Sequence, residues 1–397
     1  MLATAASFSS SLRESKAASQ PLLRLNTHNE FHIAIFADLH YGEEEDGWGI
    51  TQDVNSTRVM NEILGFEDPD FVILNGDLIT GENTLLWNST KYLDVVVKPL
   101  VEHNVRWSSA YGNHDSQYNL SREALFKEED KYSLSYTQHS PTRIPGVTNY
   151  YLPLYAQEED CDGTPIAILW FFDSQGGGEF QAPAGSENIP NWVEPSVAAW
   201  FLTEQATLKK KWGKSLPSLA FVHIPPTAFL TVQNNILPKA GEESTHFPGL
   251  NDDVPLAAEG DGTQDVPFMQ ALVDTPGLHS VYSGHDHGDA WCANWPSVAG
   301  VNHSGNTPHL CFCKHTGYGG YGNWYRGSRN LKLSFGKEMD VETWVRMENG
   351  NIVQRVSLNE TYGTDVYPLQ DGENSFVEVE MYSIVDEDEP SFQDILS

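Results

Sequence analysis

The chain of 397 residues is long enough for one large α/β domain or for two to three smaller domains. Its composition, with 40% hydrophobic and 11% aromatic residues, excludes collagen-like, coiled-coil and wholly disordered proteins. The formal net charge is −32, and residues 151–200 and 251–300 contain no Lys or Arg. Because nucleic-acid binding requires a basic face, this charge excludes a nucleic-acid partner, and it disfavours an anionic membrane surface in the same way.

The ends of the chain and its compartment are only partly defined. Residues 1–30 are expected to be a flexible leader, because they hold no apolar stretch of signal-peptide length. No apolar run approaches the roughly 18 residues of a membrane span, so we expect a soluble protein. A cytoplasmic and a secreted location both stay open. Five N-x-S/T acceptor sequences would be usable only in the secretory route, at Asn55, Asn88, Asn119, Asn302 and Asn359.

The four cysteines are too few for a disulfide scaffold. Cys311 and Cys313 are two residues apart in a strand-like segment, so their side chains point to opposite faces and we do not expect them to pair. A bridge between Cys161 and Cys292 and a pair of buried free thiols are both compatible with the sequence.

The first 115 residues alternate extended and helical patterns. Apolar runs rich in Val and Ile predict strands at 31–40, 71–77 and 105–115, and each run ends in polar residues and a turn. Helical patterns at about 55–66 and 88–103 separate the runs. This alternation predicts parallel βαβ units.

The remainder of the chain contains more strands than helices. After a polar, partly helical segment, strand-like runs occupy 165–174, 218–226, 279–288, 309–322 and 342–358. Helices are predicted at about 193–213 and 265–275, with a loop at 176–190 and a long polar insertion at 230–264. The excess of strands predicts a mixed sheet or two sheets packed face to face. We expect one folded domain at 31–360, followed by an acidic C-terminal extension at 361–397.

The residues that can carry chemistry fall at the ends of five predicted strands, where α/β enzymes place their sites. They are Asp38 and His40 in D-L-H, Asp77 in G-D, Asn113, His114 and Asp115 in G-N-H-D, His223 before two prolines, and His285 and His287 in G-H-D-H. On extended backbone, D-x-H and H-x-H direct both side chains to one face, so each pair can hold one ion. Mixed imidazole and carboxylate ligands suit Zn, Mn or Fe, and one shared carboxylate can hold two ions that clamp a phosphoryl group.

In this order, the five motifs resemble the calcineurin-like metallophosphoesterase superfamily. The resemblance implies an α/β fold, a four-layer αββα sandwich of two mixed β-sheets flanked by helices, with a dinuclear metal centre. It implies that one ion is held by Asp38, His40, Asp77 and His287, and the other by Asp77, Asn113, His223 and His285. It also implies that His114 is the general acid that protonates the leaving alkoxide, and that Asp115 orients the His114 ring.

Two departures separate the chain from purple acid phosphatases, in which the tyrosine of G-D-x-x-Y binds ferric iron. Thr80 stands at that tyrosine position, and D-L-H replaces their D-x-G. The segments GHDHGDAWC at 284–292 and HTGYGGYG at 315–322 instead resemble a purple-acid-phosphatase-like branch found in fungi and plants.

The resemblance implies a metal-dependent phosphoric ester hydrolase with two divalent ions (Mn, Zn or Fe) and a hydroxide nucleophile generated at the metals. We expect a phosphomonoesterase whose substrates are phosphorylated small molecules or phosphoproteins. The alternatives are a phosphodiesterase acting on nucleotides or phospholipid head groups and, from a different class, a catalytically silent protein that binds phosphorylated ligands. The oligomeric state does not follow from the sequence.

Overall fold

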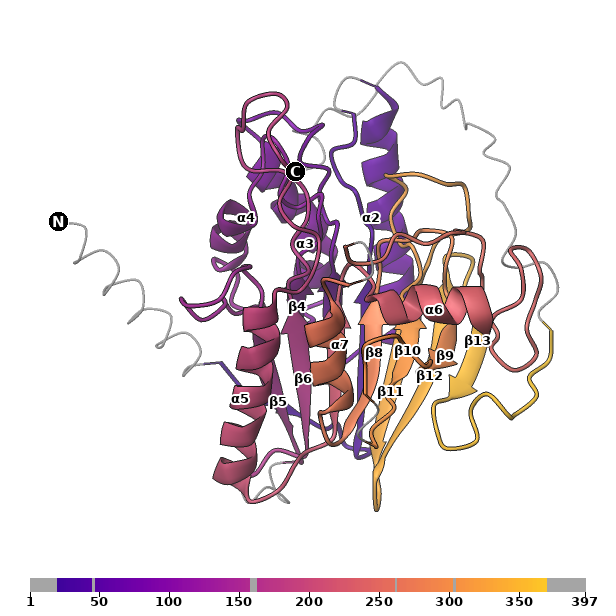
Figure 1. Cartoon of the computed structure of the whole chain (residues 1–397). Coiled ribbons are helices and arrows are strands. Elements are labelled where there is room, and N and C mark those ends of the chain that lie inside the picture. Colours follow the sequence, from indigo (N-terminus) through magenta and orange to yellow (C-terminus); the bar gives the residue numbers. More distant parts are fainter. Residues whose placement is uncertain (1–19, 45–46, 158–162, 261–262, 303–304, 370–397) are drawn as a thin grey trace.

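The computed structural model describes residues 20–44, 47–157, 163–260, 263–302 and 305–369 (Figure 1). The strands in chain order are β1 (Leu23–Arg24), β2 (Glu30–Phe36), β3 (Phe71–Asn75), β4 (Trp107–Ala110), β5 (Tyr150–Tyr155), β6 (Ala167–Phe172), β7 (Ser218–Val222), β8 (Leu278–Ser283), β9 (Cys292–Asn294), β10 (His309–Phe312), β11 (Gly327–Phe335), β12 (Met339–Met347) and β13 (Ile352–Ser357). The helices are α2 (Trp48–Glu67), α3 (Tyr92–Glu102), α4 (Arg122–Glu129), α5 (Pro195–Trp212), α6 (Thr227–Asn235) and α7 (Val266–Val273), with a 3₁₀ turn, η1 (Ser89–Lys91).

The strands form two mixed sheets. One has the order β1-β5-β6-β7-β8-β10-β9, and the other has the order β13-β12-β11-β2-β3-β4. In the first sheet β6, β7, β8 and β10 run parallel, and in the second β2, β3 and β4 do. The predicted parallel βαβ units of the N-terminal segment are therefore confirmed.

Each sheet is covered by helices on its outer face, and the two sheets face each other (Figure 1). Strand β2 shows how the sequence builds these layers. Phe31, Ile33 and Ile35 point into the core between the sheets, whereas Ala34 and Phe36 point toward α2 and α3, as alternation along a strand requires. Helices α5, α6 and α7 cover the other sheet. The predicted four-layer αββα sandwich is confirmed.

Several elements differ from the expectation. Strands β1, β5, β9 and β11 are not predicted from the sequence. Helix α6 lies at the start of the segment for which the sequence predicts a polar insertion. The turn at 348–351 joins β12 to β13 as a hairpin. Within the described ranges, no helix has both the length and the apolar character that crossing a membrane requires.

The core extends past both expected domain boundaries. Inside the expected leader, β1 pairs in parallel with β5, and Leu23 is buried between the sheets. Inside the expected acidic extension, Tyr362 is buried in the same core, and its hydroxyl donates a 2.8 Å hydrogen bond to the carbonyl of Cys292. Residues 1–19 and 370–397 lie outside the described residues, so the leader and the extension stay predictions there.

The disulfide differs from the expected alternatives. Cys292 is bonded to Cys311, while Cys313 is a buried free thiol. Cys292 and Cys311 are directly opposite each other on the antiparallel strands β9 and β10, which places their side chains on the same face. The proposed Cys161–Cys292 bridge is therefore wrong, and Cys161 itself lies outside the described residues. As expected, Cys311 and Cys313 do not pair.

Away from the predicted site residues, we expect the buried carboxyl group of Glu259 to lower the stability of the fold at pH 7. Glu259 is fully buried, and within the described part of the chain its Oε1 has no hydrogen-bond partner. Its Oε2 accepts a 3.3 Å hydrogen bond from the amide of Val193. Burial, together with the charge of Asp265, raises the pKa of Glu259 well above its ordinary value.

We expect Glu259→Gln to unfold at higher denaturant concentration than the wild type at pH 7. As pH rises through the ordinary pKa of Glu, the unfolded chain releases its proton while the folded chain keeps it, so the native carboxyl loses stability. The amide removes this loss, on the order of 1–3 kcal/mol at pH 7. Urea unfolding at pH 7 and pH 4 measures it, with the exposed Glu187→Gln as control. An equal difference at both pH values would show that ionisation is not the cause.

Candidate dinuclear metal site

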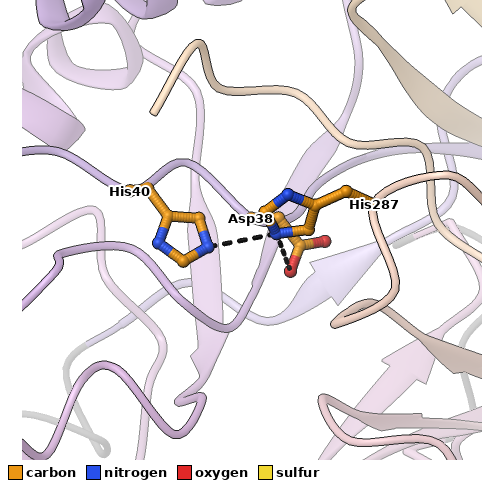
Figure 2. Close-up of side chains that lie close together, drawn as sticks. All are labelled: Asp38, His40 and His287. Carbon is orange, nitrogen blue, oxygen red and sulfur yellow. Dashed lines mark hydrogen bonds and ion pairs between the residues drawn. The ribbon is translucent and has the colours of Figure 1, made fainter. Parts of the chain in front are cut away.

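Strand ends from both sheets bring the predicted ligand residues together. Asp38 and His40 follow β2, Asp77 follows β3, Asn113 follows β4, His223 follows β7, and His285 and His287 follow β8. Two groups have ligand atoms within 4.8 Å of one another, Asp38 with His40 and His287, and Asp77 with His223 and His285. We name them the first and the second cluster, and Figure 2 shows the first.

The backbone at these ligands lies in the left-handed region. The φ angles are 56° at Asp38, 49° at His40, 50° at Asp77 and 78° at His285. Residues other than Gly seldom adopt this conformation, and the surrounding structure has to stabilise it. Here it turns each side chain sharply out of its strand end and into the space between the two sheets.

Gly76 shows how closely the two sheets approach at this point. Its φ is 86°, and a Cβ atom there would lie 2.2 Å from Nδ1 of His223. The glycine of the G-D motif therefore makes room for a ligand from the other sheet.

In the first cluster, two imidazoles face each other. Nε2 of His40 lies 3.2 Å from Nε2 of His287, which in turn lies 3.8 Å from Oδ1 of Asp38 (Figure 2). Nδ1 of His287 donates to the carbonyl of Tyr321 at 2.8 Å, and Nδ1 of His40 lies 3.0 Å from Oγ1 of Thr80. With Nδ1 occupied on both rings, the two Nε2 atoms point into the cluster.

The charge state of these rings suits a cation between them. Burial, together with the neighbouring His114, lowers the pKa of His40 to about 3, and burial and His40 lower the pKa of His287 well below its ordinary value. Both rings are therefore neutral at pH 7, with lone pairs directed at each other. Burial raises the pKa of Asp38 to about 7, and its Oδ1 accepts the amide of His285 at 2.9 Å. A metal ion resolves this arrangement of opposed donors.

In the second cluster, the carboxylate of Asp77 lies between ligands of both groups. Its Oδ2 is 2.9 Å from Nε2 of His223 and 3.8 Å from Nε2 of His40. Nδ1 of His223 donates to the carbonyl of Asn75 at 2.9 Å, which directs Nε2 at Asp77. Although burial raises the pKa of Asp77, the charges of His223 and His114 lower it well below its ordinary value. The side chain of Asp77 thus reaches both clusters. Oδ1 of Asp38 also lies 4.0 Å from Nε2 of His223, but Asp77 makes the shorter contact between the clusters.

An unpartnered oxygen belongs to Asn113, whose neighbour His114 donates its backbone amide to Oδ1 of Asp77 at 2.8 Å. Oδ1 of Asn113 is buried and has no hydrogen-bond partner among the described residues. A buried amide oxygen without a partner costs free energy unless a ligand satisfies it, and amide oxygen is a common metal donor. The donor set of both clusters therefore fits two metal ions, which Asp38, His40, Asp77, Asn113, His223, His285 and His287 would hold.

His114 lies at the edge of the two clusters with a carboxylate partner that the sequence analysis missed. Nδ1 of His114 is 2.6 Å from Oε1 of Glu82, and its backbone amide donates to Oδ1 of Asp77 at 2.8 Å. Although burial lowers the pKa of His114, the charges of Asp77 and Glu82 raise it to about 10. The side chain is 31% exposed, so a protonated imidazole is open to a bound substrate.

Asp115 does not orient the His114 ring, contrary to the expectation. Its Oδ1 accepts the backbone amides of Leu78 and Ile79 at 2.9 and 3.1 Å, and its Oδ2 accepts the amide of Gly112 at 2.8 Å. Because the side chain points back at these amides, it joins the G-D loop to the G-N-H-D loop. Asp115 therefore fixes the backbone that carries Asp77 and His114.

The glycine-rich segment 315–322 packs directly on the first cluster. A Cβ atom at Gly320 would lie 2.4 Å from Cε1 of His287 and 2.8 Å from Cδ2 of His40. The ring of Tyr321 stacks on His287 with centroids 4.0 Å apart. The glycines thus permit this segment to pack closely over the rings of His40 and His287.

Two clusters of histidine and carboxylate, joined through one aspartate at the strand ends of two facing sheets, define the class of metallophosphatases. A family model described as calcineurin-like phosphoesterase matches residues 31–289, and the chain belongs to this family. Members of the family depend on two metal ions, and the two clusters are the candidate sites for them in this chain.

The similar proteins are purple-acid-phosphatase-like proteins of plants and yeast. The chain is 27% identical over 368 residues to "Probable inactive purple acid phosphatase 14" of Arabidopsis thaliana, covering 83% of each chain. It is 26% identical over 351 residues to "Phosphatase DCR2" of Saccharomyces cerevisiae, covering 83% of this chain and 55% of that protein. Among solved structures, a dimetal phosphatase from Danio rerio matches with a TM-score of 0.48 and 13% identity, over 83% of this chain and 98% of that one.

Proposed function

We propose that the protein is a phosphomonoesterase with two divalent ions, in which His114 is the general acid. The observation that carries this proposal is the pairing of His114 with Glu82 at 2.6 Å, beside the carboxylate shared by the two clusters. The carboxylate of Glu82 favours the protonated imidazole, which is the state that a general acid requires.

The charges of the site favour a phosphomonoester. Two divalent ions would bring four positive charges, against two negative charges from Asp38 and Asp77. The metal-loaded site would therefore be positively charged, and a positive site attracts a phosphomonoester dianion more strongly than a diester monoanion. When bound, the ions neutralise the phosphoryl oxygens and supply an activated water.

The remaining chemistry belongs to the chain's own residues. His114 holds a proton on Nε2, facing away from Glu82, and donates it to the oxygen of the leaving alcohol. Glu82 holds the ring in place and stabilises its charge. Asp115 positions the backbone of both loops through its three amide contacts. The loops that carry Asp77 and His114 are therefore held together by one side chain.

Exposed apolar side chains beside the acid support phosphoproteins as a substrate class. Four apolar residues have about half of their surface exposed, namely Leu86, Trp87, Tyr118 and Phe180. Hydrogen bonds join the three loops that carry these residues. Nδ2 of Asn119 donates to the carbonyl of Thr84, and the amide of Gln181 donates to the carbonyl of Tyr118. The amide of Gly81 donates to the carbonyl of His114, which attaches them to the acid. Apolar residues that flank a phosphorylated side chain would contact this surface.

We expect metal-loaded protein to cleave p-nitrophenyl phosphate with a kcat/KM at least about 10-fold above that for bis(p-nitrophenyl) phosphate, because only the monoester is a dianion. Steady-state assays with Mn²⁺, Zn²⁺ or Fe²⁺, on protein whose metal content is measured, test this. Faster cleavage of the diester would instead indicate a phosphodiesterase. Cleavage of neither ester by protein with two bound ions would indicate a silent binding protein, in line with the names of the plant relatives.

A further inference from the structure

Among the clustered histidines, Nδ1 of His40 contacts a side chain, whereas Nδ1 of His223 and of His287 contacts backbone. Nδ1 of His223 and Nδ1 of His287 both donate to carbonyl oxygens, of Asn75 and Tyr321. Nδ1 of His40 instead contacts the hydroxyl of Thr80 at 3.0 Å. This hydroxyl in turn donates to Oε2 of Glu43 at 2.5 Å.

The hydroxyl fixes the tautomer of His40. Thr80 has a single hydroxyl proton, and the carboxylate of Glu43 can only accept, so this proton points at Glu43. The oxygen of Thr80 must then accept from His40, which places the ring proton on Nδ1. The lone pair of Nε2 consequently faces His287 and the cluster.

Glu43 also contacts the opposite side of the same cluster. Its Oε2 accepts the backbone amide of Gly320 at 3.4 Å. Gly320 lies against the rings of both His40 and His287. One carboxylate thus joins the loops that follow β2, β3 and β10 around the two facing imidazoles.

We propose that Thr80 and Glu43 form a relay that positions His40 as a metal ligand and makes its Nε2 a stronger donor. Hydrogen bonding of the remote ring nitrogen to an anionic or oxygen acceptor raises the donor strength of the ligating nitrogen, and its loss weakens metal binding by about 10–100-fold. Both are positioning residues, because neither needs to touch the ion. The inference rests on the proposed metal centre and not on phosphatase activity, since its readout is metal binding.

Calorimetric titration of metal-free protein with Mn²⁺ tests the relay. Thr80→Val keeps the shape of the side chain and removes the hydroxyl, so we expect one of the two sites to bind about 10–100-fold more weakly. Thr80→Ser restores the hydroxyl and should recover most of the affinity. The matched control is Thr84→Val, a buried threonine on the same loop whose hydroxyl donates to the carbonyl of Gly81.

A second readout separates positioning from packing. In the metal-free protein, ¹⁵N chemical shifts of the His40 ring should show the proton on Nδ1 in the wild type and in Thr80→Ser. In Thr80→Val the two tautomers should both be populated. Thermal unfolding checks that each variant folds.

Several outcomes would overturn the relay. The relay would be refuted if Thr80→Val bound Mn²⁺ with wild-type affinity. It would also be refuted if Thr80→Val and Thr80→Ser lost Mn²⁺ affinity equally. An unchanged His40 tautomer in Thr80→Val would show that the hydroxyl does not fix the ring. If the wild type binds no ion, the metal centre and the relay both fail, whereas two tight sites with no ester cleavage would leave the relay standing and refute the phosphatase proposal.

Discussion

Replacement of Asp77 by Asn is expected to lower kcat for p-nitrophenyl phosphate by at least about 10³-fold, equivalent to about 4 kcal/mol. The carboxylate of Asp77 lies 2.9 Å from Nε2 of His223 in the second cluster and 3.8 Å from Nε2 of His40 in the first. An amide supplies one neutral oxygen donor where the carboxylate supplies two charged ones. The variant should therefore hold fewer ions than the wild type, and elemental analysis of the purified protein measures this.

The control for Asp77→Asn is Asp94→Asn on α3, where the carboxylate accepts a hydrogen bond from Tyr132 and lies outside both clusters. It should keep two ions and full activity. Unchanged metal content in Asp77→Asn would rule out the assignment of Asp77 as the shared ligand. Loss of metal in both variants would point to a general effect on folding.

Replacement of His114 by Asn is expected to lower kcat by about 10²–10⁴-fold for an alkyl phosphate, because the alkoxide cannot leave without a proton. The loss should be below about 10-fold for p-nitrophenyl phosphate, whose phenolate is a stable leaving group and needs little protonation. Metal content should not change, since Nδ1 of His114 is bonded to Glu82 and the ring lies outside both clusters. The measurement is kcat for a series of esters with leaving groups of rising pKa.

The exposed His103→Asn provides the control for His114→Asn and should follow the wild type at every leaving group. Equal losses for alkyl and aryl esters in His114→Asn would argue against a general acid. Such a result would instead assign His114 to binding of the phosphoryl group in the ground state.

The clustering of the proposed ligands could be predicted because each one follows a buried strand. A run such as residues 31–36 is recognisable from its apolar alternation, and the carboxyl ends of parallel strands meet at one edge of a sheet. Asp38, His40 and Asp77 therefore had to lie close together once β2 and β3 were parallel neighbours. The order of the motifs then placed His223 and His287 on the facing sheet.

The partners of those ligands could not be predicted, because they come from tertiary approach and carry no sequence spacing. Glu82 reaches His114 only because the amide of Gly81 is bonded to the carbonyl of His114. Asp115 is adjacent to His114 in sequence, yet its side chain points to backbone amides of the G-D loop. The position of Asp115 next to His114 in the sequence therefore suggested Asp115 as the partner of the imidazole, whereas Glu82 is the partner in the structure.

Strand β11 and the disulfide were also not predicted, because both depend on tertiary contacts. Strand β11 carries the polar residues Arg329 and Asn330, which are buried between β12 and β2 and mask its strand character in the sequence. The Cys292–Cys311 bond depends on the register of β9 against β10, which the two short segments do not reveal by themselves.

The most direct test of the two-ion site is anomalous diffraction from crystals grown with Mn²⁺. We expect two peaks per chain, both next to the carboxylate of Asp77 and about 2.0–2.3 Å from their ligand atoms. One peak should contact Asp38, His40 and His287, and the other Asn113, His223 and His285. A single peak, or two peaks of which neither touches Asp77, would contradict it.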